Sequence, residues 1–305
     1  MTQLSRRSIA LVGPGELAHY LLEELAKQHD VLVLTRSSKN WILDLNVSQQ
    51  LIKDYSAESV LPYLQNREVL ISTLSITDSS AIDVHLGLLD ACTRSKSCKK
   101  FIPSEFTGNI RDEPMQPIFY YETHEPIREA LRQQDNVAWT LFCNGWFMDY
   151  VVPASNRHFK DGQSFAMNWK TKVIKVYGKG THVFDLTCGR DVGKALAELV
   201  KYDEWEEYTF IRGETISWQG LFDVVHRRDP TWTKQTVPFA QSLKLIVDNG
   251  EDKVRGQLEV YAHSDGALLP DDDVQAQRAK YFQGIKFRSL EEFLDEAEAH
   301  PNRIL

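Results

Sequence analysis

The sequence predicts an α/β fold: a doubly wound parallel sheet with a smaller α+β lobe at its C-terminal end. In the first half, short apolar segments that fit strands alternate with longer segments in which apolar residues recur every three or four positions, as in helices. The strand-like segments of the second half are shorter and less regular. We therefore expect residues 1–150 to form the sheet domain and residues 151–305 the smaller lobe, with some of its elements returning to the sheet.

The N-terminal half supplies the expected sheet and its helices. The apolar run Ser8–Val12 begins the sheet, and Glu16–Gln28 follows as an amphipathic helix. Further strands are expected at Val31–Thr35, Gln50–Asp54, Val69–Thr73, Lys100–Pro103 and Ala138–Cys143, and further helices at Val60–Gln65, Asp78–Arg94 and Tyr120–Gln134. Ligands of such sheets bind outside the carboxyl ends of the strands, so we expect the loops that follow these strands to share one rim.

The C-terminal half begins with two strand-like segments, Phe165–Trp169 and Val173–Tyr177, which we expect to pair as a hairpin. Near the end of the chain, Ser289–Glu292 has the capping-box pattern and opens an acidic amphipathic helix. Between them we expect strands at Val183–Leu186 and Tyr208–Ile211, helices at Asp191–Val200 and Ile216–Val225, loops at Asp229–Pro238 and His263–Asp273, and a charged, solvated stretch at Asp248–Arg255.

A glycine-rich turn joins the first strand to the first helix. It reads Gly13-x-Gly15-x-x-Ala18, which is the pattern of a Rossmann-type dinucleotide site. Gly13 suits a tight turn, Gly15 lets the main chain approach a pyrophosphate closely, and Ala18 is small enough for the helix to pack on the strand. The unpaired N–H groups at the start of the helix favour an anion.

The loop after the second strand indicates which dinucleotide binds. Folds that prefer NAD place an acidic residue there to bind the ribose 2′-hydroxyl. This chain instead has Arg36, followed by Ser37, Ser38 and Lys39. A guanidinium pairs with a 2′-phosphate and stacks on adenine. The sequence therefore favours NADP(H) over NAD(H).

Composition argues against several other classes of protein. The net charge of −8 gives no basic footprint for nucleic acid or an anionic membrane, and no apolar run is long enough for a signal peptide or a membrane span. We expect a cytoplasmic protein, monomeric or homodimeric, that acts on a small molecule. The four cysteines have no metal-ligand spacing, so no metal site is expected. Cys143 and Cys188 lie in apolar surroundings, whereas Cys92 and Cys98 flank a basic turn and are expected to be more exposed.

Several segments resemble the isoflavone-reductase-like and NmrA-like branch of the atypical short-chain dehydrogenases/reductases. The first is GPGELA with the later TRSS, and the second, the most specific, is FIPSEFTGNI at 101–110. AWTLFCNGWFMDY at 138–150 resembles the family's T-x-x-x-x-G-x-F segment, and Asp191-Val-Gly193 resembles its D-V/I-G segment. These matches lie mostly in the N-terminal half and end near Tyr202.

The resemblance implies a Rossmann domain with a smaller substrate lobe. It also implies a reductase that uses NADPH on small aromatic, phenylpropanoid or polyketide-like molecules, although regulatory members bind the dinucleotide without turning it over. It places four sets of residues around the dinucleotide: Gly13, Pro14, Gly15, Glu16, Leu17 and Ala18 at the pyrophosphate; Arg36 and Ser37 at the 2′-phosphate; Thr73, Leu74 and Ser75 at the ribose; and Pro103, Ser104, Glu105 and Phe106 at the nicotinamide.

The chain departs from the family in the helix after the PSEF loop. Reductases of this branch carry a Lys there, whereas this chain reads YYETHEPIREAL and has His124 in the lysine's place. Hydride transfer builds negative charge on the substrate oxygen, which a nearby donor must neutralise, and an imidazole can act as an acid near neutral pH. Tyr120 lies four residues earlier on the same helix face. We expect His124, with Tyr120, to be catalytic; the alternative is that His124 is solvated on a polar face.

Aromatic residues follow the last strand of the N-terminal half. Trp146 and Phe147 come directly after Gly145, at the end of the strand, and are expected to wall a substrate pocket. Asn144 is a candidate hydrogen-bonding partner of the substrate. Trp139 and Phe142 are expected in the core.

These features predict an NADPH-dependent reductase of a small aromatic or polyketide-like secondary metabolite, acting on a carbonyl or an activated double bond. Two alternatives stay open. One is an isomerase or cyclase that keeps the nucleotide as a scaffold, since an imidazole can also move a proton without redox chemistry. The other is an NADP(H)-sensing regulatory protein that binds a partner through its C-terminal lobe.

Overall fold

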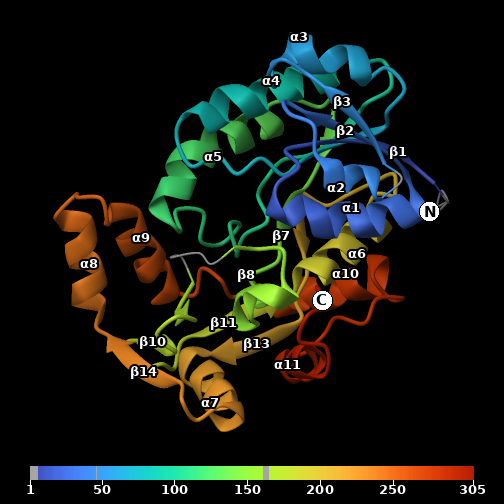
Figure 1. Cartoon of the computed structure of the whole chain (residues 1–305). Coiled ribbons are helices and arrows are strands. Elements are labelled where there is room, and N and C mark those ends of the chain that lie inside the picture. The colour runs from blue at the N-terminus through green and yellow to red at the C-terminus, as the bar shows by residue number, and fades with distance from the viewer. Residues whose placement is uncertain (1–5, 46, 161–164) are drawn as a thin grey trace.

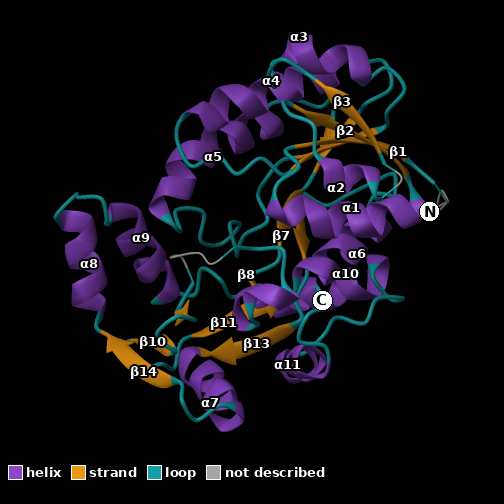
Figure 2. Cartoon of the chain, in the orientation of Figure 1, coloured by secondary structure: helices purple, strands orange, loops and turns teal. Residues whose placement is uncertain are grey.

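The computed structural model describes residues 6–45, 47–160 and 165–305 and has the predicted α/β fold (Figures 1 and 2). Its central sheet is parallel, with strand order β3-β2-β1-β4-β5-β6. The strands are β1 (Ser8–Val12), β2 (Asp30–Thr35), β3 (Ser48–Leu51), β4 (Val69–Ser72), β5 (Lys100–Ile102) and β6 (Ala138–Trp139). This order reverses direction at β1 and β4, and such a reversal opens the crevice in which doubly wound sheets bind ligands.

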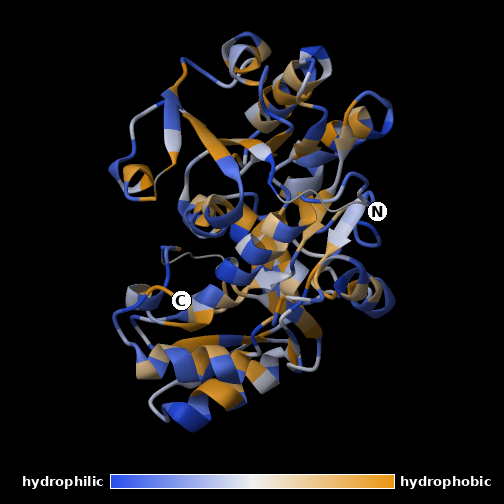
Figure 3. Cartoon of the chain, turned by 90° about the vertical axis from the view of Figure 1, so that its right-hand side faces the viewer, coloured by the Kyte–Doolittle hydropathy of each residue, from blue (hydrophilic) through white to orange (hydrophobic). Residues whose placement is uncertain are grey.

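Helices cover both faces of the sheet. On one face α1 (Glu16–Gln28) packs against α6 (Gly189–Leu199), and on the other α4 (Ser80–Arg94) packs against α5 (Ile118–Arg132). The alternation of side chains along β1 explains both layers, because Ile9 and Leu11 join the core under α1 whereas Ala10 and Val12 join the core under α4. In Figure 3 the helices carry both hydrophobic and hydrophilic residues, as expected of elements with one face on a core.

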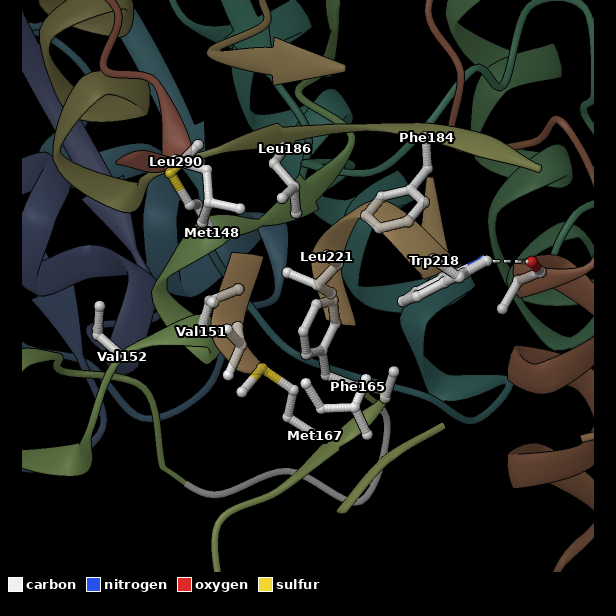
Figure 4. Packing of buried hydrophobic residues seen from close by; sticks show 14 of the residues in the cluster. Met148, Val151, Val152, Phe165, Met167, Phe184, Leu186, Trp218, Leu221 and Leu290 are labelled. Atoms are coloured by element: carbon white, nitrogen blue, oxygen red, sulfur yellow. Dashed lines mark hydrogen bonds between the residues drawn. The ribbon is translucent and has the colours of Figure 1, made fainter. Parts of the chain in front are cut away.

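Three small sheets build the C-terminal lobe. Their orders are β14-β10-β9, β13-β11-β8 and β12-β7. The first two of these sheets share a hydrophobic core, in which Trp218 donates a hydrogen bond from Nε1 to the carbonyl oxygen of Ala262 over 2.7 Å (Figure 4), whereas the apolar side chains of the β12-β7 sheet join the cores of the main sheet. The strands are β7 (Leu141–Cys143), β8 (Trp146–Phe147), β9 (Met167–Asn168), β10 (Val173–Tyr177), β11 (Val183–Thr187), β12 (Tyr208–Phe210), β13 (Glu214–Ser217) and β14 (Thr233–Val237).

Two further helices, α2 (Asn40–Leu43) and α3 (Ala57–Val60), lie beside the main sheet. The second half of the chain adds five more: α7 (Trp218–Arg228), α8 (Phe239–Val247), α9 (Lys253–Ala262), α10 (Asp271–Tyr281) and α11 (Leu290–Ala299). Ser289 and Glu292 form the predicted capping box at the start of α11. Because α6 lies on α1 and β12 pairs with β7, elements after residue 151 do lie on the N-terminal layers. A domain boundary at residue 150 stays a prediction.

Several expected elements differ from the structure. The hairpin of β9 and β10 is present, but the expectation of a loop at Asp229–Pro238 is wrong, because this stretch contains β14, which pairs in parallel with β10. Four of the five side chains of β14 are exposed and polar, so the strand has no apolar alternation to reveal it. The expected strand at 138–143 is two strands: β6 pairs with β5, while β7 pairs with β12.

Smaller shifts have local causes. The third strand begins at Ser48 rather than Gln50, because it is an edge strand whose side chains are all at least partly exposed. The helix expected at Val60–Gln65 begins earlier, at Ala57, because Ser56 caps it by accepting a hydrogen bond from Ser59 N. The helix expected from Ile216 begins at Trp218. The solvated stretch expected at 248–255 contains the start of α9, and the loop expected at 263–273 contains the start of α10. Helix α8 was not expected.

Cys92 and Cys98 are not exposed, contrary to expectation. Both thiols are fully buried, with the sulfur atoms 3.8 Å apart and no disulfide between them, because Cys92 lies on the buried face of α4 and Cys98 joins the same hydrophobic core. Within the described part of the chain no helix has the length and hydropathy needed to span a bilayer.

Candidate active site

The glycine turn has the geometry that its sequence predicts. Gly13 has a φ of +83°, and a Cβ there would lie 2.8 Å from the backbone nitrogen of Leu74. Thr73 holds the turn from the other side, donating from Oγ1 to the Gly13 carbonyl over 2.6 Å. Gly15 is different, because the atom nearest to a Cβ built on it is 3.9 Å away. No described residue therefore crowds position 15, and the space beside it stays open.

A cavity of about 580 Å³ opens over this turn, at the carboxyl ends of the parallel strands. It brings together residues from five predicted loops and from α5. The predicted site residues that line it are Gly13, Pro14, Gly15, Glu16, Leu17, Arg36, Ser37, Thr73, Leu74, Ser75, Ser104, Glu105, Phe106, Tyr120, His124 and Phe147.

Four predicted site residues lie outside the lining. Ala18 is fully buried where α1 packs on the sheet, and Pro103, the first residue of the PSEF loop, is buried. Asn144 is fully buried and donates to the carbonyl oxygen of its neighbour Gly145. Trp146 turns into the lobe core, where its ring lies 5.3 Å from that of Tyr261. Their roles as contacts of a cofactor or substrate stay predictions.

The end of the cavity near β2 is basic and carries an aromatic ring. Arg36 and Lys39 line it, and the Arg36 guanidinium lies 5.3 Å from the centre of the Tyr55 ring. Tyr55 was not predicted, although it follows directly after the rim residue Asp54. Asp54 itself is outside the lining, and its carboxylate accepts hydrogen bonds from the Ser56 and Ser59 hydroxyls over 2.5 and 2.6 Å.

The opposite end of the cavity contains His124. Its side chain is only 4% exposed, so His124 is not a solvated residue on a polar helix face. Its Nδ1 lies 2.8 Å from the Thr123 hydroxyl, which in turn donates to the Phe119 carbonyl over 2.8 Å. Burial lowers the pKa of His124, and the attraction of the Glu105 carboxylate only partly offsets this. The neutral imidazole therefore predominates at pH 7.

Tyr120 supports this imidazole from one side. The two rings stack with their centres 3.8 Å apart. The Tyr120 hydroxyl donates to the Glu105 carbonyl over 2.8 Å, and burial raises its pKa well above the usual value. The phenol therefore stays protonated, and its proton is already engaged by the backbone.

A buried ion pair anchors the PSEF loop to α5. Arg128 donates to both carboxylate oxygens of Glu105 over 3.0 Å, and both side chains are almost completely buried. Burial alone would raise the pKa of Glu105, but the Arg128 charge outweighs it and lowers the pKa. The loop that lines the cavity is thus tied to the helix that carries His124.

A second histidine lies behind His124, and sequence reasoning gave it no partner. His85 donates from Nδ1 to the Ala81 carbonyl over 2.9 Å, so its Nε2 accepts from the Ser72 hydroxyl over 3.1 Å. Its ring centre is 6.3 Å from that of His124. Burial lowers the pKa of His85 to about 4, although the hydrogen bond to Ala81 opposes this.

Three aromatic side chains wall the cavity on the side of the C-terminal lobe. Phe147 was predicted to line it and Tyr150 belongs to the same aromatic segment, which offered it as a further candidate, whereas Phe159 was not predicted. The Phe159 ring lies 4.7 Å from Phe147 and 5.5 Å from Tyr150. Phe159 lies between the segment that ends at Tyr150 and the one that begins at Asp191, where no motif was recognised, so only the fold could reveal its place in the wall.

Comparison with known proteins decides the family. No family model matches the chain. The oxidoreductase swnR of Metarhizium robertsii, however, is 40% identical over 304 residues, which cover 97% of this chain and 99% of that protein. The chain belongs to the NmrA-like and isoflavone-reductase-like family of atypical short-chain dehydrogenases/reductases. A second swnR oxidoreductase, from Arthroderma benhamiae, is 36% identical over the same shares of the two chains.

More distant members of the family agree with this assignment. An NmrA-like family domain-containing oxidoreductase of Gibberella moniliformis is 24% identical over 250 residues, covering 72% of this chain and 76% of that protein. Among solved structures, leucoanthocyanidin reductase from Vitis vinifera superposes with a TM-score of 0.74 at 16% identity, over 96% of this chain and 99% of its own. An isoflavone reductase superposes with a TM-score of 0.72, also at 16% identity and over the same shares. This member of the family is thus an oxidoreductase with the fold of the isoflavone reductases.

Proposed function

We propose that this oxidoreductase uses NADPH to reduce a carbonyl or an activated double bond of a small aromatic or polyketide-like secondary metabolite. The observation that carries the proposal is one cavity with the glycine turn and Arg36 at one end and the buried His124 at the other. Related proteins support the cofactor: a structure of the Vitis vinifera leucoanthocyanidin reductase is a complex with NADPH, and one of AtPrR2 contains NADP⁺ and (+)pinoresinol.

The residues present fit a phosphorylated dinucleotide. The open space over Gly15 gives room for a pyrophosphate beside the start of α1. Arg36 and Lys39 supply two positive charges for a 2′-phosphate, and Arg36 and Tyr55 offer flat faces for adenine. When bound, the reduced cofactor supplies a hydride.

His124 is the group that we assign to the substrate oxygen. Thr123 holds Nδ1 and Tyr120 holds the ring face, so the imidazole is fixed where it lines the cavity. The imidazole would first take up a proton from solvent, and the resulting imidazolium would pass that proton to the substrate oxygen as negative charge develops there, which returns His124 to its neutral form. Glu105, which already opposes the lowering of this pKa, would stabilise the imidazolium.

We assign Tyr120 a positioning role. Its hydroxyl proton is held by the Glu105 carbonyl, so it is not free to move to a substrate. Phe147, Tyr150 and Phe159 supply an apolar wall that suits an aromatic or polyketide-like body.

The test combines binding with turnover. NADPH and NADP⁺ are titrated by fluorescence, and NADPH consumption is then followed with a panel of aromatic ketones and enones. The proposal predicts consumption that falls roughly a hundredfold or more in His124→Ala while the NADPH affinity stays unchanged. His182→Ala, a change at a partly exposed histidine outside the cavity lining, is the matched control and should keep full activity.

Other outcomes would favour the alternatives. Product formation without NADPH consumption would indicate an isomerase or cyclase. Tight NADPH binding without turnover of any compound in the panel would indicate a sensor. A reductase that keeps full activity in His124→Ala would refute the assignment of this residue.

A further inference from the structure

A second cavity, of about 520 Å³, lies in the C-terminal lobe on one face of the β14-β10-β9 sheet. Along β10, Ile174 and Val176 point into the lobe core, so Val173 and Lys175 point the opposite way, into the cavity. Gln235 of β14 is the register partner of Lys175 and lies in the same wall. The second cavity shares none of its lining residues with the cavity that contains His124.

The charge of this second cavity is one-sided. Among the described residues, Lys170, Lys175 and Arg255 line it and no Asp or Glu does. The compensating acids lie behind the wall: Glu259 accepts from Lys175 over 2.6 Å, and the largely exposed Asp252 pairs with Nη2 of Arg255 over 3.0 Å. The remaining surface offers the side-chain amides of Asn168 and Gln235.

Arg255 has an unused donor at this place. Its Nε atom is buried and has no hydrogen-bond partner within the described ranges, since the nearest acid, Glu259, is 4.0 Å away. A buried N–H without an acceptor is unfavourable. The Arg255 side chain as a whole is 37% exposed, so a ligand in the cavity would meet the accessible part of its guanidinium. Guanidinium groups bind carboxylates well because their donors match the two oxygens.

An apolar floor lies beside the cations. It includes the Trp169 indole and the edges of Phe165 and Met167, whose side chains point into the lobe core (Figure 4). Tyr150, which lines the first cavity, also contacts this floor. Trp169 donates from Nε1 to the Tyr150 carbonyl over 3.0 Å, and the rings of Phe165 and Tyr150 stack 5.6 Å apart.

We propose that this second cavity binds a small organic carboxylate with an apolar, ring-containing body. The carboxylate pairs with Arg255 and Lys170, and the ring lies on the floor formed by Trp169. Such a molecule is either the far end of the substrate or a separate effector, and Tyr150 is the contact through which its binding reaches the first cavity.

The test is calorimetric titration with 2-naphthoate of the full chain saturated with NADP⁺. We expect saturable binding to the wild type, at least tenfold weaker binding to Arg255→Gln, and at least tenfold weaker binding of the neutral analogue 2-naphthamide to the wild type. Lys234→Gln is the matched control. Lys234 precedes Gln235 on β14 but points away from the cavity, where its Nζ contacts the Gln219 side chain over 2.9 Å. The Lys234→Gln variant should bind 2-naphthoate as tightly as the wild type does.

A cavity-filling variant tests the proposed binding without changing any charge. Gln235→Trp places an indole in the cavity from an exposed strand position, and it should abolish binding while the melting temperature stays unchanged. Equal binding by wild type and Arg255→Gln, equal binding of naphthoate and naphthamide, or no saturable binding at millimolar concentration would each overturn the proposal.

Kinetics then separate the two sources of the carboxylate. Inhibition by 2-naphthoate that is competitive with the substrate assigns the cavity to the far end of the substrate. A change in turnover that is not competitive assigns it to an effector. The titration measures binding without turnover, so its result remains valid even if the proposed reductase activity is refuted.

Discussion

The imidazole of His124 and the phenol of Tyr120 lie face to face, with their ring planes 11° apart. This arrangement follows from their spacing of four residues on α5, which places both on one helix face. The stack fixes the imidazole plane, while Thr123 holds its Nδ1 atom. Catalysis and positioning are thus divided between two neighbouring side chains.

Tyr120→Phe tests this division. The variant keeps the stacked ring and loses the hydroxyl, which is shared between the Glu105 carbonyl at 2.8 Å and the Ser104 carbonyl at 3.2 Å, so we expect a loss of about 1 kcal/mol in unfolding free energy. Turnover should remain within about threefold of the wild type, because the phenol proton is not the one transferred. A hundredfold fall in kcat with unchanged stability would instead make Tyr120 the proton donor.

The two glycines of the turn should separate stability from binding. Gly13→Ala forces a side chain onto a residue with a φ of +83° and against the Leu74 backbone, so the unfolding free energy should fall by about 1–3 kcal/mol. Gly15→Ala meets no protein atom closer than 3.9 Å, so stability should change by less than about 1 kcal/mol. Its NADPH affinity should nevertheless fall about tenfold or more, since the new methyl group occupies the phosphate space. Denaturant unfolding and fluorescence titration measure the two effects, and equal loss of stability in both variants would contradict this account.

Arg36→Ala tests the preference for the phosphorylated cofactor. Loss of a charged partner of the 2′-phosphate should weaken NADPH about tenfold to a hundredfold and leave the affinity for NADH almost unchanged. Lys53→Ala removes an equal charge from an exposed residue outside the cavity lining and serves as the control. Equal losses for NADPH and NADH in Arg36→Ala would refute the 2′-phosphate assignment.

His85 should make the protein less stable in acid. Its pKa is about 4 in the folded protein against 6.5 as the ordinary value, so between these two pH values the unfolded chain binds a proton that the folded chain does not. The unfolding free energy therefore falls as the pH drops below 6.5, by an amount on the order of 3 kcal/mol for this residue alone. His85→Gln should show a shallower fall across this window in denaturant unfolding, whereas the control His182→Gln should follow the wild type. A slope in His85→Gln as steep as that of the wild type would show that other groups are responsible.

The N-terminal part of the site could be predicted because its signals are local. Gly13, Arg36 and His124 lie in short motifs whose spacing alone places them at strand ends or on one helix face. The structure brings all three to one cavity, as that spacing requires. The same holds for β1 and α1, whose predicted bounds agree with the structure.

The rest depended on contacts between distant parts of the chain. Phe159 reaches the cavity from the second half, and β14 pairs with β10 across about sixty residues of chain without an apolar pattern of its own. Asn144 and Trp146 follow a strand end, as cavity residues do, but both pack behind the wall. Whether a residue after a strand faces the ligand or the core depends on what packs against it, which periodicity does not report.

The most direct test of the central claim follows the hydride itself. NADPH carrying deuterium at C4 of the nicotinamide is prepared as each of its two stereoisomers and is supplied with a compound that the wild type converts. The account predicts that one of the two isomers delivers its label to the product, with one cofactor oxidised for each product formed, and that His124→Ala slows this transfer at saturating NADPH. Product that carries no label from either isomer, formed while the cofactor stays reduced, would contradict the account.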